Sequence, residues 1–224
     1  MVSVIVLAGG RGKRMGSATS KQYIELNGKP ILYYTLKKFI DNKLINKIIL
    51  VIPEDEIEYC KKEVLERYDL KIDELALGGK ERQDSVYNGL KKAAGSDIVL
   101  IHDGARPFIS EKIINQGIKY AGIYKAAAPG VMPKDTIKIK DEGNFSTDTP
   151  LRSSLVAVQS PLAFDYKMIC EWHEKVKEQN IQVTDDTMVA ELFGNKVYLY
   201  EGEYTNIKIT TPEDLVLAEY LVKN

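Results

Sequence analysis

The chain has 224 residues, which suits one large domain with a sizeable buried core. Its 31 lysines and arginines almost balance its 32 aspartates and glutamates, and this argues against a protein that binds nucleic acid without regard to sequence. No apolar run reaches the roughly 18 residues of a membrane-spanning helix, and we find no signal peptide. We therefore expect a cytoplasmic protein with neither a membrane nor a nucleic-acid partner.

Short apolar runs alternate with helical patterns along the whole chain. We expect strands at Val4–Ala8, Lys47–Ile52, Asp97–His102, Ile123–Ala128, Leu155–Gln159, Lys196–Tyr200 and Asn206–Thr210. Apolar residues at helical spacing predict helices over residues 31–40, 86–93, 113–121 and 168–176, and a last helix that begins at Thr211-Pro212. The alternation predicts an α/β fold with three layers and a mainly parallel, twisted sheet. We find no linker and no repeat, and we therefore expect residues 1–224 to form a single domain.

One segment breaks this alternation. Residues 134–154 contain an alternating stretch at Thr136–Lys140, followed by a turn-forming stretch at Asp141–Asn144. We interpret the segment as an antiparallel β-arm that projects from the sheet. A two-stranded ribbon is marginally stable alone, so we expect the arm to pack on a second subunit.

The first chemical signal is the loop that follows the first strand. Val4–Ala8 runs directly into Gly9–Gly16, where four glycines alternate with Arg11, Lys13 and Arg14. Such a loop brings backbone N–H groups close to a phosphate. Its spacing matches neither the dinucleotide-binding GxGxxG pattern nor a P-loop, so an NAD-dependent dehydrogenase is the weakest interpretation. From spacing alone, phosphate binding and a purely structural turn both stay open.

Further polar motifs are expected at the same edge of the sheet, because ligands bind at the carboxyl ends of parallel strands. They are the glycine-rich turn Gly78–Ser85, the stretch His102–Phe108, the acidic stretch Thr184–Thr187 and the stretch Asn206–Thr210. The Gly78–Ser85 turn leads into a helix, whose N-terminus suits an anion. The sequence therefore predicts one composite site at this edge.

Single charged residues and the two histidines of the chain also allow a structural interpretation beside a functional one. Asp103 suits either a turn or Mg²⁺ held near phosphates. His102 is better explained as a structural residue at a strand end than as a general base, and His173 as a solvated residue of a charged helix. Lys208 lies between two isoleucines, so it either reaches the surface or meets an anion.

The chain has no Ser-His-Asp signature and no His/Cys cluster of a metal site. Its cations, amides and few carboxylates suit phosphoryl or nucleotidyl transfer, in which catalysis comes from positioning and from neutralising developing charge.

Seven motifs in order resemble one known family over nearly the whole chain. They are Leu7–Gly16, Lys21–Tyr23, Gly78–Val86, His102–Phe108, Asp135–Lys138, Thr184–Asp186 and Asn206–Thr210. Together they resemble the 2-C-methyl-D-erythritol 4-phosphate cytidylyltransferases, a group of sugar-phosphate cytidylyltransferases. The resemblance implies a Rossmann-like nucleotidyltransferase fold and transfer of CMP from CTP to 2-C-methyl-D-erythritol 4-phosphate. The products would be pyrophosphate and 4-diphosphocytidyl-2-C-methyl-D-erythritol, a precursor in isoprenoid synthesis.

The resemblance also implies roles for particular residues. Those that would bind CTP are Ala8, Gly9, Gly10, Gly12, Lys21, Gly79, Ser85, Asp103 and Ala105, with Mg²⁺ on Asp103. The catalytic set would be Arg14, Lys21, Arg152 and Lys208. Those that would bind the substrate are Arg106, Thr136, Arg152, Thr184 and Lys208. In this family the arm crosses to the partner of a homodimer, so Arg152 would serve the neighbouring active site.

Two departures from the family pattern bear on the substrate. Gly9 stands where the family usually has alanine, and glycine there is familiar from the related ribitol 5-phosphate cytidylyltransferases. Leu162 stands where both groups usually have glutamine. Ribitol 5-phosphate is therefore the alternative substrate, and a non-catalytic nucleotide-binding protein is a weaker alternative. The stretch from His102 to Phe108 favours methylerythritol phosphate.

Overall fold

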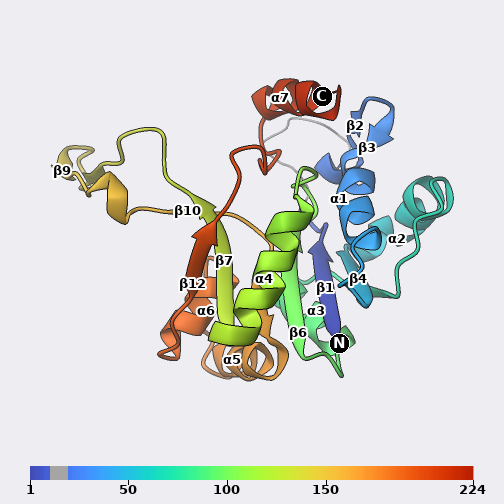
Figure 1. Ribbon diagram of the computed structural model, residues 1–224, viewed down its shortest axis with the longest axis horizontal. Coiled ribbons are helices and arrows are strands. Elements are labelled where there is room, and N and C mark those ends of the chain that lie inside the picture. Colours follow the sequence, from blue (N-terminus) through green and yellow to red (C-terminus); the bar gives the residue numbers. More distant parts are fainter. Residues whose placement is uncertain (11–19, 224) are drawn as a thin grey trace.

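A computed structural model describes residues 1–10 and 20–223. Its central sheet contains β1 (Val2–Leu7), β4 (Lys47–Ile52), β5 (Glu74–Leu77), β6 (Ile98–Asp103), β7 (Ala126–Val131), β10 (Ala157–Val158), β11 (Leu162–Asp165) and β12 (Tyr198–Glu201). The order across the sheet is β10-β7-β11-β6-β1-β4-β5, and β12 pairs with β7 (Figure 1). The pairs formed by β1, β4, β5 and β6 among themselves are parallel, whereas β10 and β11 run antiparallel to their neighbours.

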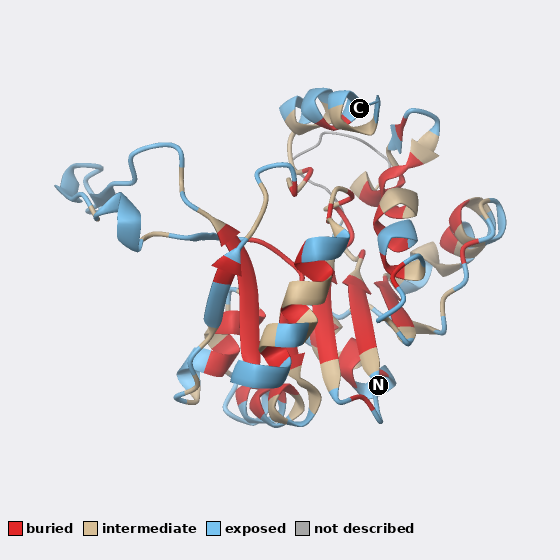
Figure 2. Cartoon of the chain, in the orientation of Figure 1, coloured by how far each residue is buried: buried red, intermediate tan, exposed pale blue. Residues whose placement is uncertain are grey.

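Helices cover both faces of the sheet. The helices are α1 (Ile31–Ile40), α2 (Ile57–Cys60), α3 (Arg82–Lys92), α4 (Glu111–Tyr124), α5 (Tyr166–Glu178), α6 (Asp186–Leu192) and α7 (Pro212–Lys223). Alternate residues of β1 separate two buried clusters: Val4 and Val6 pack with α1 and α4, and Ile5 packs with α3, α5 and α6. The expected three-layer α/β fold is thereby confirmed (Figures 1 and 2). None of the described helices is long and apolar enough to cross a membrane.

Short elements complete the fold. They are η2 (Lys21–Tyr23), β2 (Glu25–Leu26), β3 (Lys29–Pro30), η3 (Glu54–Glu56), the π-helical turn η4 (Lys61–Glu66), β8 (Ile139–Lys140), β9 (Ser146–Asp148) and η5 (Arg152–Ser154). β2 and β3 form a small hairpin, and α7 packs over it through Ala218, which joins Leu26, Ile31 and Ile209 in a third buried cluster.

Two expected strands differ from the structure. Residues 206–210 form an extended loop, tied to the site by the Ile209 amide, which donates to the Ala105 carbonyl at 2.9 Å. The strand expected at 123–128 begins only at Ala126, because α4 runs on to Tyr124 and ends where Lys125 adopts a left-handed conformation, with φ of 72°. The sequence patterns also missed β5, β11 and the helices α2 and α6.

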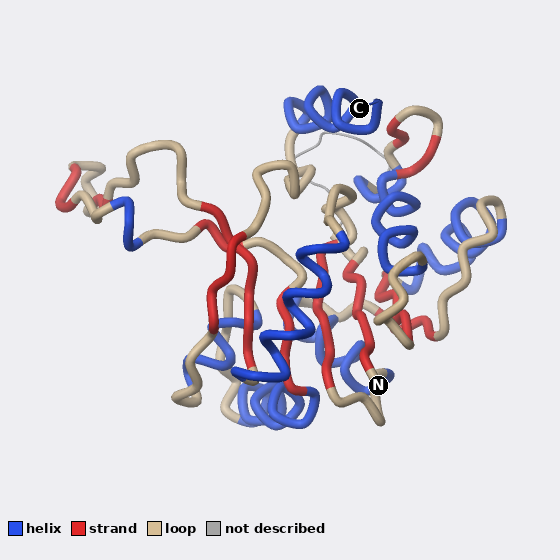
Figure 3. Tube along the Cα trace, viewed as in Figure 1, coloured by secondary structure: helices blue, strands red, loops and turns tan. Residues whose placement is uncertain are grey.

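The expected arm is present and leaves the body of the molecule (Figures 1 and 3). β8 and β9 pair antiparallel within it, around a turn at Asp141–Asn144. Each strand has only two or three residues, and the arm carries exposed apolar side chains, with Phe145 74% exposed and Leu151 76% exposed. The arm therefore lacks a core of its own in the single chain.

Candidate active site

A pocket of about 300 Å³ opens at the carboxyl ends of β1 and β6. It is lined by Leu7, Ala8, Gly9, Gly10, Lys21, Gln22, Gly79, Lys80, Glu81, Arg82, Ser85, Asp103, Ala105 and Lys208. Four chain segments meet there: the end of β1, η2, the start of α3 and the end of β6. The loop before α7 adds Lys208. The position is the one that open parallel sheets use for ligands.

The turn before α3 is built by local contacts. The Gly79 amide donates to Ser85 Oγ at 2.9 Å, and the Glu81 amide donates to the Asp84 carboxylate at 3.0 Å. Residue 79 must be glycine, because a Cβ there would lie 2.2 Å from the Cβ of Asp84. This tight turn directs the first turn of α3 into the pocket, where backbone N–H groups favour negative charge.

Asp103, at the end of β6, is a carboxylate of the pocket that pairs with Lys208. Its Oδ2 lies 2.8 Å from Lys208 Nζ and 3.7 Å from Arg106 Nε. Burial alone would raise the pKa of Asp103, but the charges of Lys208 and then Arg82 hold it well below its usual range. Asp103 is therefore ionised at neutral pH, and Lys208 meets an anion, one of the two outcomes expected from its sequence.

A buried network fixes the backbone under Asp103. The Asp103 amide donates to Ser160 Oγ, and the neighbouring His102 contacts Ser160 Oγ through Nδ1, each at 3.1 Å. His102 Nε2 lies 3.1 Å from the Arg106 carbonyl. Because a carbonyl only accepts, Nε2 carries the proton and Nδ1 accepts from Ser160. Burial lowers the pKa of His102 to about 4, so the ring is neutral and structural.

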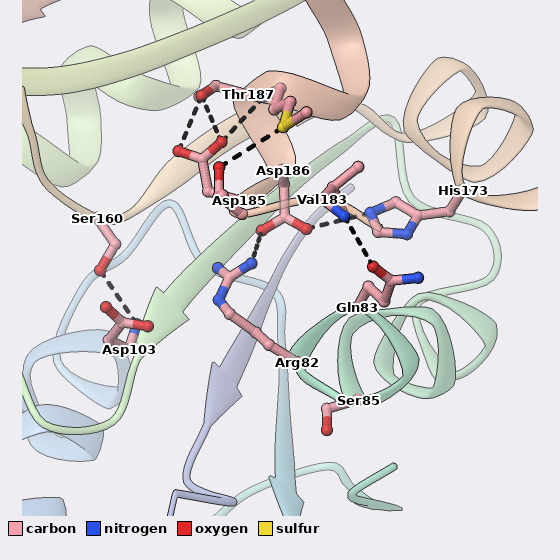
Figure 4. A network of polar contacts seen from close by, with 12 residues as sticks. Arg82, Gln83, Ser85, Asp103, Ser160, His173, Val183, Asp185, Asp186 and Thr187 are labelled. Carbon is pink, nitrogen blue, oxygen red and sulfur yellow. Dashed lines mark hydrogen bonds and ion pairs between the residues drawn. The ribbon is translucent and has the colours of Figure 1, made fainter. Parts of the chain in front are cut away.

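A second buried network joins the start of α3 to α5 and α6 (Figure 4). Arg82 Nη1 lies 2.7 Å from Asp186 Oδ2, and His173 Nε2 lies 3.1 Å from Asp186 Oδ1. Asp186 is fully buried, and burial would raise its pKa, but the charge of Arg82 and the hydrogen bond from His173 lower it. His173 is only 2% exposed, so its interpretation as a solvated residue is wrong.

Gln83 extends this connection. Its side-chain amide accepts from the Val183 amide at 3.1 Å (Figure 4) and donates to the Ile181 carbonyl at 3.0 Å. The start of α3 is thus joined to the loop before α6, which carries Thr184. Thr184 itself is exposed, and its hydroxyl donates to Met188 Sδ at 3.6 Å.

The structure brings most of the expected nucleotide-binding residues together. Ala8, Gly9, Gly10, Lys21, Gly79, Ser85, Asp103 and Ala105 all line the pocket. Lys208, expected in the catalytic and substrate-binding sets, lines it as well. Gly12 and Arg14 lie outside the described residues. No described atom lies within 4 Å of the position that a Cβ would take at Gly9, so alanine would fit there equally well.

The remaining expected site residues lie away from the lining. Arg106 lies outside the pocket lining but contacts residues near it. Its Nη1 donates to the Asn206 carbonyl at 2.7 Å, and its Nε lies 3.7 Å from Asp103 Oδ2. Thr136 and Arg152 are on the exposed arm, where Arg152 Nη2 donates to Thr136 Oγ1 at 3.4 Å. Within one described chain the arm residues and the pocket are therefore separate.

Sequence patterns missed one contributor to the pocket, and they singled out one residue that lies outside it. Arg82 lines the pocket and is 34% exposed, although the sequence singled out only the glycines and Ser85 of its turn. Leu162, a departure from the family pattern, is 3% exposed in β11, packs in the apolar core and is absent from the pocket lining. A basic residue at the first position of a helix after a glycine-rich turn is a signal that could have identified Arg82.

Comparison with known proteins identifies the family. The sequence profile of 2-C-methyl-D-erythritol 4-phosphate cytidylyltransferase matches residues 2–224. The chain belongs to this family. A cytidylyltransferase of this name from Clostridium beijerinckii is 71% identical over 224 residues, which cover 100% of this chain and 99% of that protein. One from Clostridium botulinum strain Eklund 17B is 65% identical over 222 residues and covers 99% of both chains.

Solved cytidylyltransferase structures have the same Rossmann-like fold. The 4-diphosphocytidyl-2C-methyl-D-erythritol synthase of Anaerococcus prevotii superposes with a TM-score of 0.88 at 37% identity, over 100% of this chain and 96% of that one. The enzyme of Thermus thermophilus superposes with a TM-score of 0.81 at 30% identity, over 99% of this chain and 98% of that one. The fold is thus shared over the whole chain, and members of the family are nucleotidyltransferases.

Proposed function

We propose that this chain transfers the cytidylyl group of CTP to 2-C-methyl-D-erythritol 4-phosphate and releases pyrophosphate. The observation that carries the proposal is the pocket at the ends of β1 and β6. Among the described residues, four cations and two carboxylates line it, namely Lys21, Lys80, Arg82, Lys208, Glu81 and Asp103, and Lys208 pairs with Asp103. The pocket has the charge needed for two anionic substrates, and the curated relatives bear the name of this activity over the full chain.

The proposed reaction needs no general base. An oxygen of the 4-phosphate attacks the α-phosphorus of CTP, the new P–O bond forms, and the bond to the β-phosphate bridging oxygen breaks. The attacking phosphate is already anionic, so the barrier lies in bringing two anions together. Lys21 and Lys208 reduce that barrier by placing positive charge beside the transferring group, and we assign Arg14 to the same task.

We assign the nucleotide to the glycine-rich side of the pocket. The end of β1 contributes Ala8, Gly9 and Gly10, and the start of α3 contributes Gly79 and Ser85. The N–H groups at these two places suit the triphosphate. Gly12 and Ala105 complete the proposed CTP-binding set.

Asp103 fits a magnesium site. It is kept ionised and borders the pocket, and Mg²⁺ commonly binds through one or two carboxylates together with substrate phosphates. When bound, Mg²⁺ would neutralise negative charge on the CTP phosphates. No group of three or more His, Cys, Asp or Glu suited to a metal occurs in the described part of the chain, so the proposed ion depends on the nucleotide for further ligands.

We also propose a homodimer formed through the arm. The apolar side chains of Phe145 and Leu151 are exposed to solvent in the single chain, and a second subunit would bury them. The same contact would bring Thr136 and Arg152 to the partner's pocket, where they would bind the polyol phosphate with Thr184 and Arg106. A cytoplasmic location stays a prediction.

The proposal is tested by measuring pyrophosphate release from CTP with each component left out in turn. We expect release to require CTP, Mg²⁺ and methylerythritol phosphate together. CTP binding without release, across a panel of polyol phosphates, would instead support the non-catalytic nucleotide-binding protein.

A further inference from the structure

Lys21 belongs to a helical turn that is too short to be stable without contacts from outside it. It begins η2, a single 3-10 turn of three residues, and Ser20 before it makes no side-chain capping bond to the turn. One helical turn fixes several backbone angles for very few hydrogen bonds, so it is unstable without outside support. The amine of Lys21 donates to the Ile209 carbonyl at 3.4 Å, but the backbone of this turn, which carries the side chain, depends on contacts made by the neighbouring residues.

Glu56, at the end of η3, supplies these contacts. Its Oε1 accepts a hydrogen bond from the Ser20 hydroxyl, and its Oε2 accepts from Gln22 Nε2 at 2.9 Å. Both oxygens of one carboxylate thus hold the residues directly before and after Lys21. Hydrogen bonds to a charged group are stronger than those between neutral groups.

The Gln22 side chain also contacts Ala8, the residue directly before the glycine-rich loop Gly9–Gly16. Gln22 is 1% exposed, and its Nε2 also donates to the Ala8 carbonyl at 2.7 Å. Ala8 and Lys21 both line the pocket, whereas Glu56 does not. Through Gln22, the Glu56 carboxylate therefore helps to set the position of Lys21 relative to Ala8, although Glu56 itself lies outside the pocket lining.

We infer that Glu56 is a positioning residue, which holds Lys21 in place for the transition state. The inference rests on the proposed function, because it assumes that Lys21 acts on the transferring phosphoryl group. In Glu56→Gln the side chain loses its charge, and its amide nitrogen cannot accept from Ser20, so the Ser20 hydroxyl must turn to accept instead. Both contacts then lose the strength that the charged carboxylate gave them. Misplacement of a catalytic group by about 1 Å can lower the rate about 10²-fold.

The test is a double-mutant cycle between Glu56 and Lys21, measured as kcat and KM for pyrophosphate release. Glu56→Gln should lower kcat about tenfold or more, with less than a threefold change in the KM for CTP. In the Lys21→Ala background the same substitution should change kcat less than about twofold, because the group that it positions is gone. An equal loss in both backgrounds, or an unchanged kcat, would overturn the inference.

The matched control is Glu58→Gln. It removes the same charge two residues further on, from a side chain that is 89% exposed and pairs with Lys61 at the surface. It should leave kcat unchanged. Ser20→Ala provides a milder variant, which removes one contact and keeps the carboxylate, and its kcat should fall between those of the wild type and Glu56→Gln.

A measurement without turnover separates this inference from the proposed function. Lysine acetylation by acetic anhydride is followed by peptide mass spectrometry in the wild type and in Glu56→Gln. The acetylation rate of Lys21 should differ at least threefold between the two proteins, whereas the acetylation rate of Lys61 should be the same in both. An equal acetylation rate of Lys21 in the two proteins would refute the positioning role. If the wild type releases no pyrophosphate, the proposed function fails, while this labelling result still decides the role of Glu56.

Discussion

Lys208 Nζ and Asp103 Oδ2 lie 2.8 Å apart at the edge of the pocket. Lys208 comes from the loop before α7 and Asp103 from the end of β6, so their contact joins distant parts of the chain at the pocket. Because the pKa of Asp103 is lowered, the contact stabilises the fold fully above the unfolded value of about 3.9. This stabilisation is lost as the pH falls toward the lower pKa of the folded state.

Lys208→Met should therefore lower the free energy of unfolding most at neutral pH. The difference from the wild type should narrow progressively below about pH 4, where the unfolded chain takes up the proton of Asp103. Urea unfolding between pH 7 and pH 3 measures it, with Lys61→Met as the control for an exposed pair. A difference that is constant over this range would contradict the assignment.

His102 gives a second pH dependence, in a higher range. Burial lowers its pKa to about 4, whereas the unfolded residue titrates near 6.5, so the unfolded chain binds the proton first as the pH falls. Stability is fully present above about pH 6.5 and is lost toward pH 4. Urea unfolding should show that the wild type loses about 2 kcal/mol more than His102→Gln between pH 7 and pH 5. Equal losses in the two proteins would show that His102 does not drive the change.

Lys21→Ala should lower kcat by at least about 10² while the thermal unfolding midpoint stays within a few degrees of the wild type. The amine supplies charge that is needed mainly in the transition state, so the KM for CTP should change less than kcat. Steady-state kinetics and a melting curve check both parts. A variant with nearly normal kcat would remove Lys21 from the catalytic set.

The arm is tested by mixing two inactive variants. Arg152→Ala and Lys21→Ala, purified separately and allowed to exchange subunits, should regain activity if Arg152 serves the partner's site, because a mixed dimer then has one intact site. Pyrophosphate release after mixing measures the recovery, and each variant incubated alone is the control. No recovery, despite subunit exchange seen by native mass spectrometry, would mean that Arg152 acts within its own chain or not at all.

Local patterns predicted the layers of this fold and much of its site. The buried run at Lys47–Ile52 and the helix at 31–40 have the expected bounds, because an apolar strand and an amphipathic helix are encoded by adjacent residues. Asp103 and the glycines were found because motifs after parallel strands converge at one edge.

Pairings over long sequence distances could not be predicted in the same way. His173 lies among charged neighbours in α5, and only the packing of α6 brings Asp186 to it and buries both. Residues 206–210 alternate as a strand would, but they serve as the loop that carries Lys208 to Asp103. Glu56 had no local signal at all, since its partners lie in a separate turn.

The most direct test of the central claim compares two acceptors. Pyrophosphate release from CTP is measured with 2-C-methyl-D-erythritol 4-phosphate and with ribitol 5-phosphate under the same conditions, and the nucleotide product is identified by mass spectrometry. We predict a kcat/KM at least tenfold higher for methylerythritol phosphate, with 4-diphosphocytidyl-2-C-methyl-D-erythritol as the product. Faster turnover of ribitol 5-phosphate, with CDP-ribitol as the product, would contradict the proposed function.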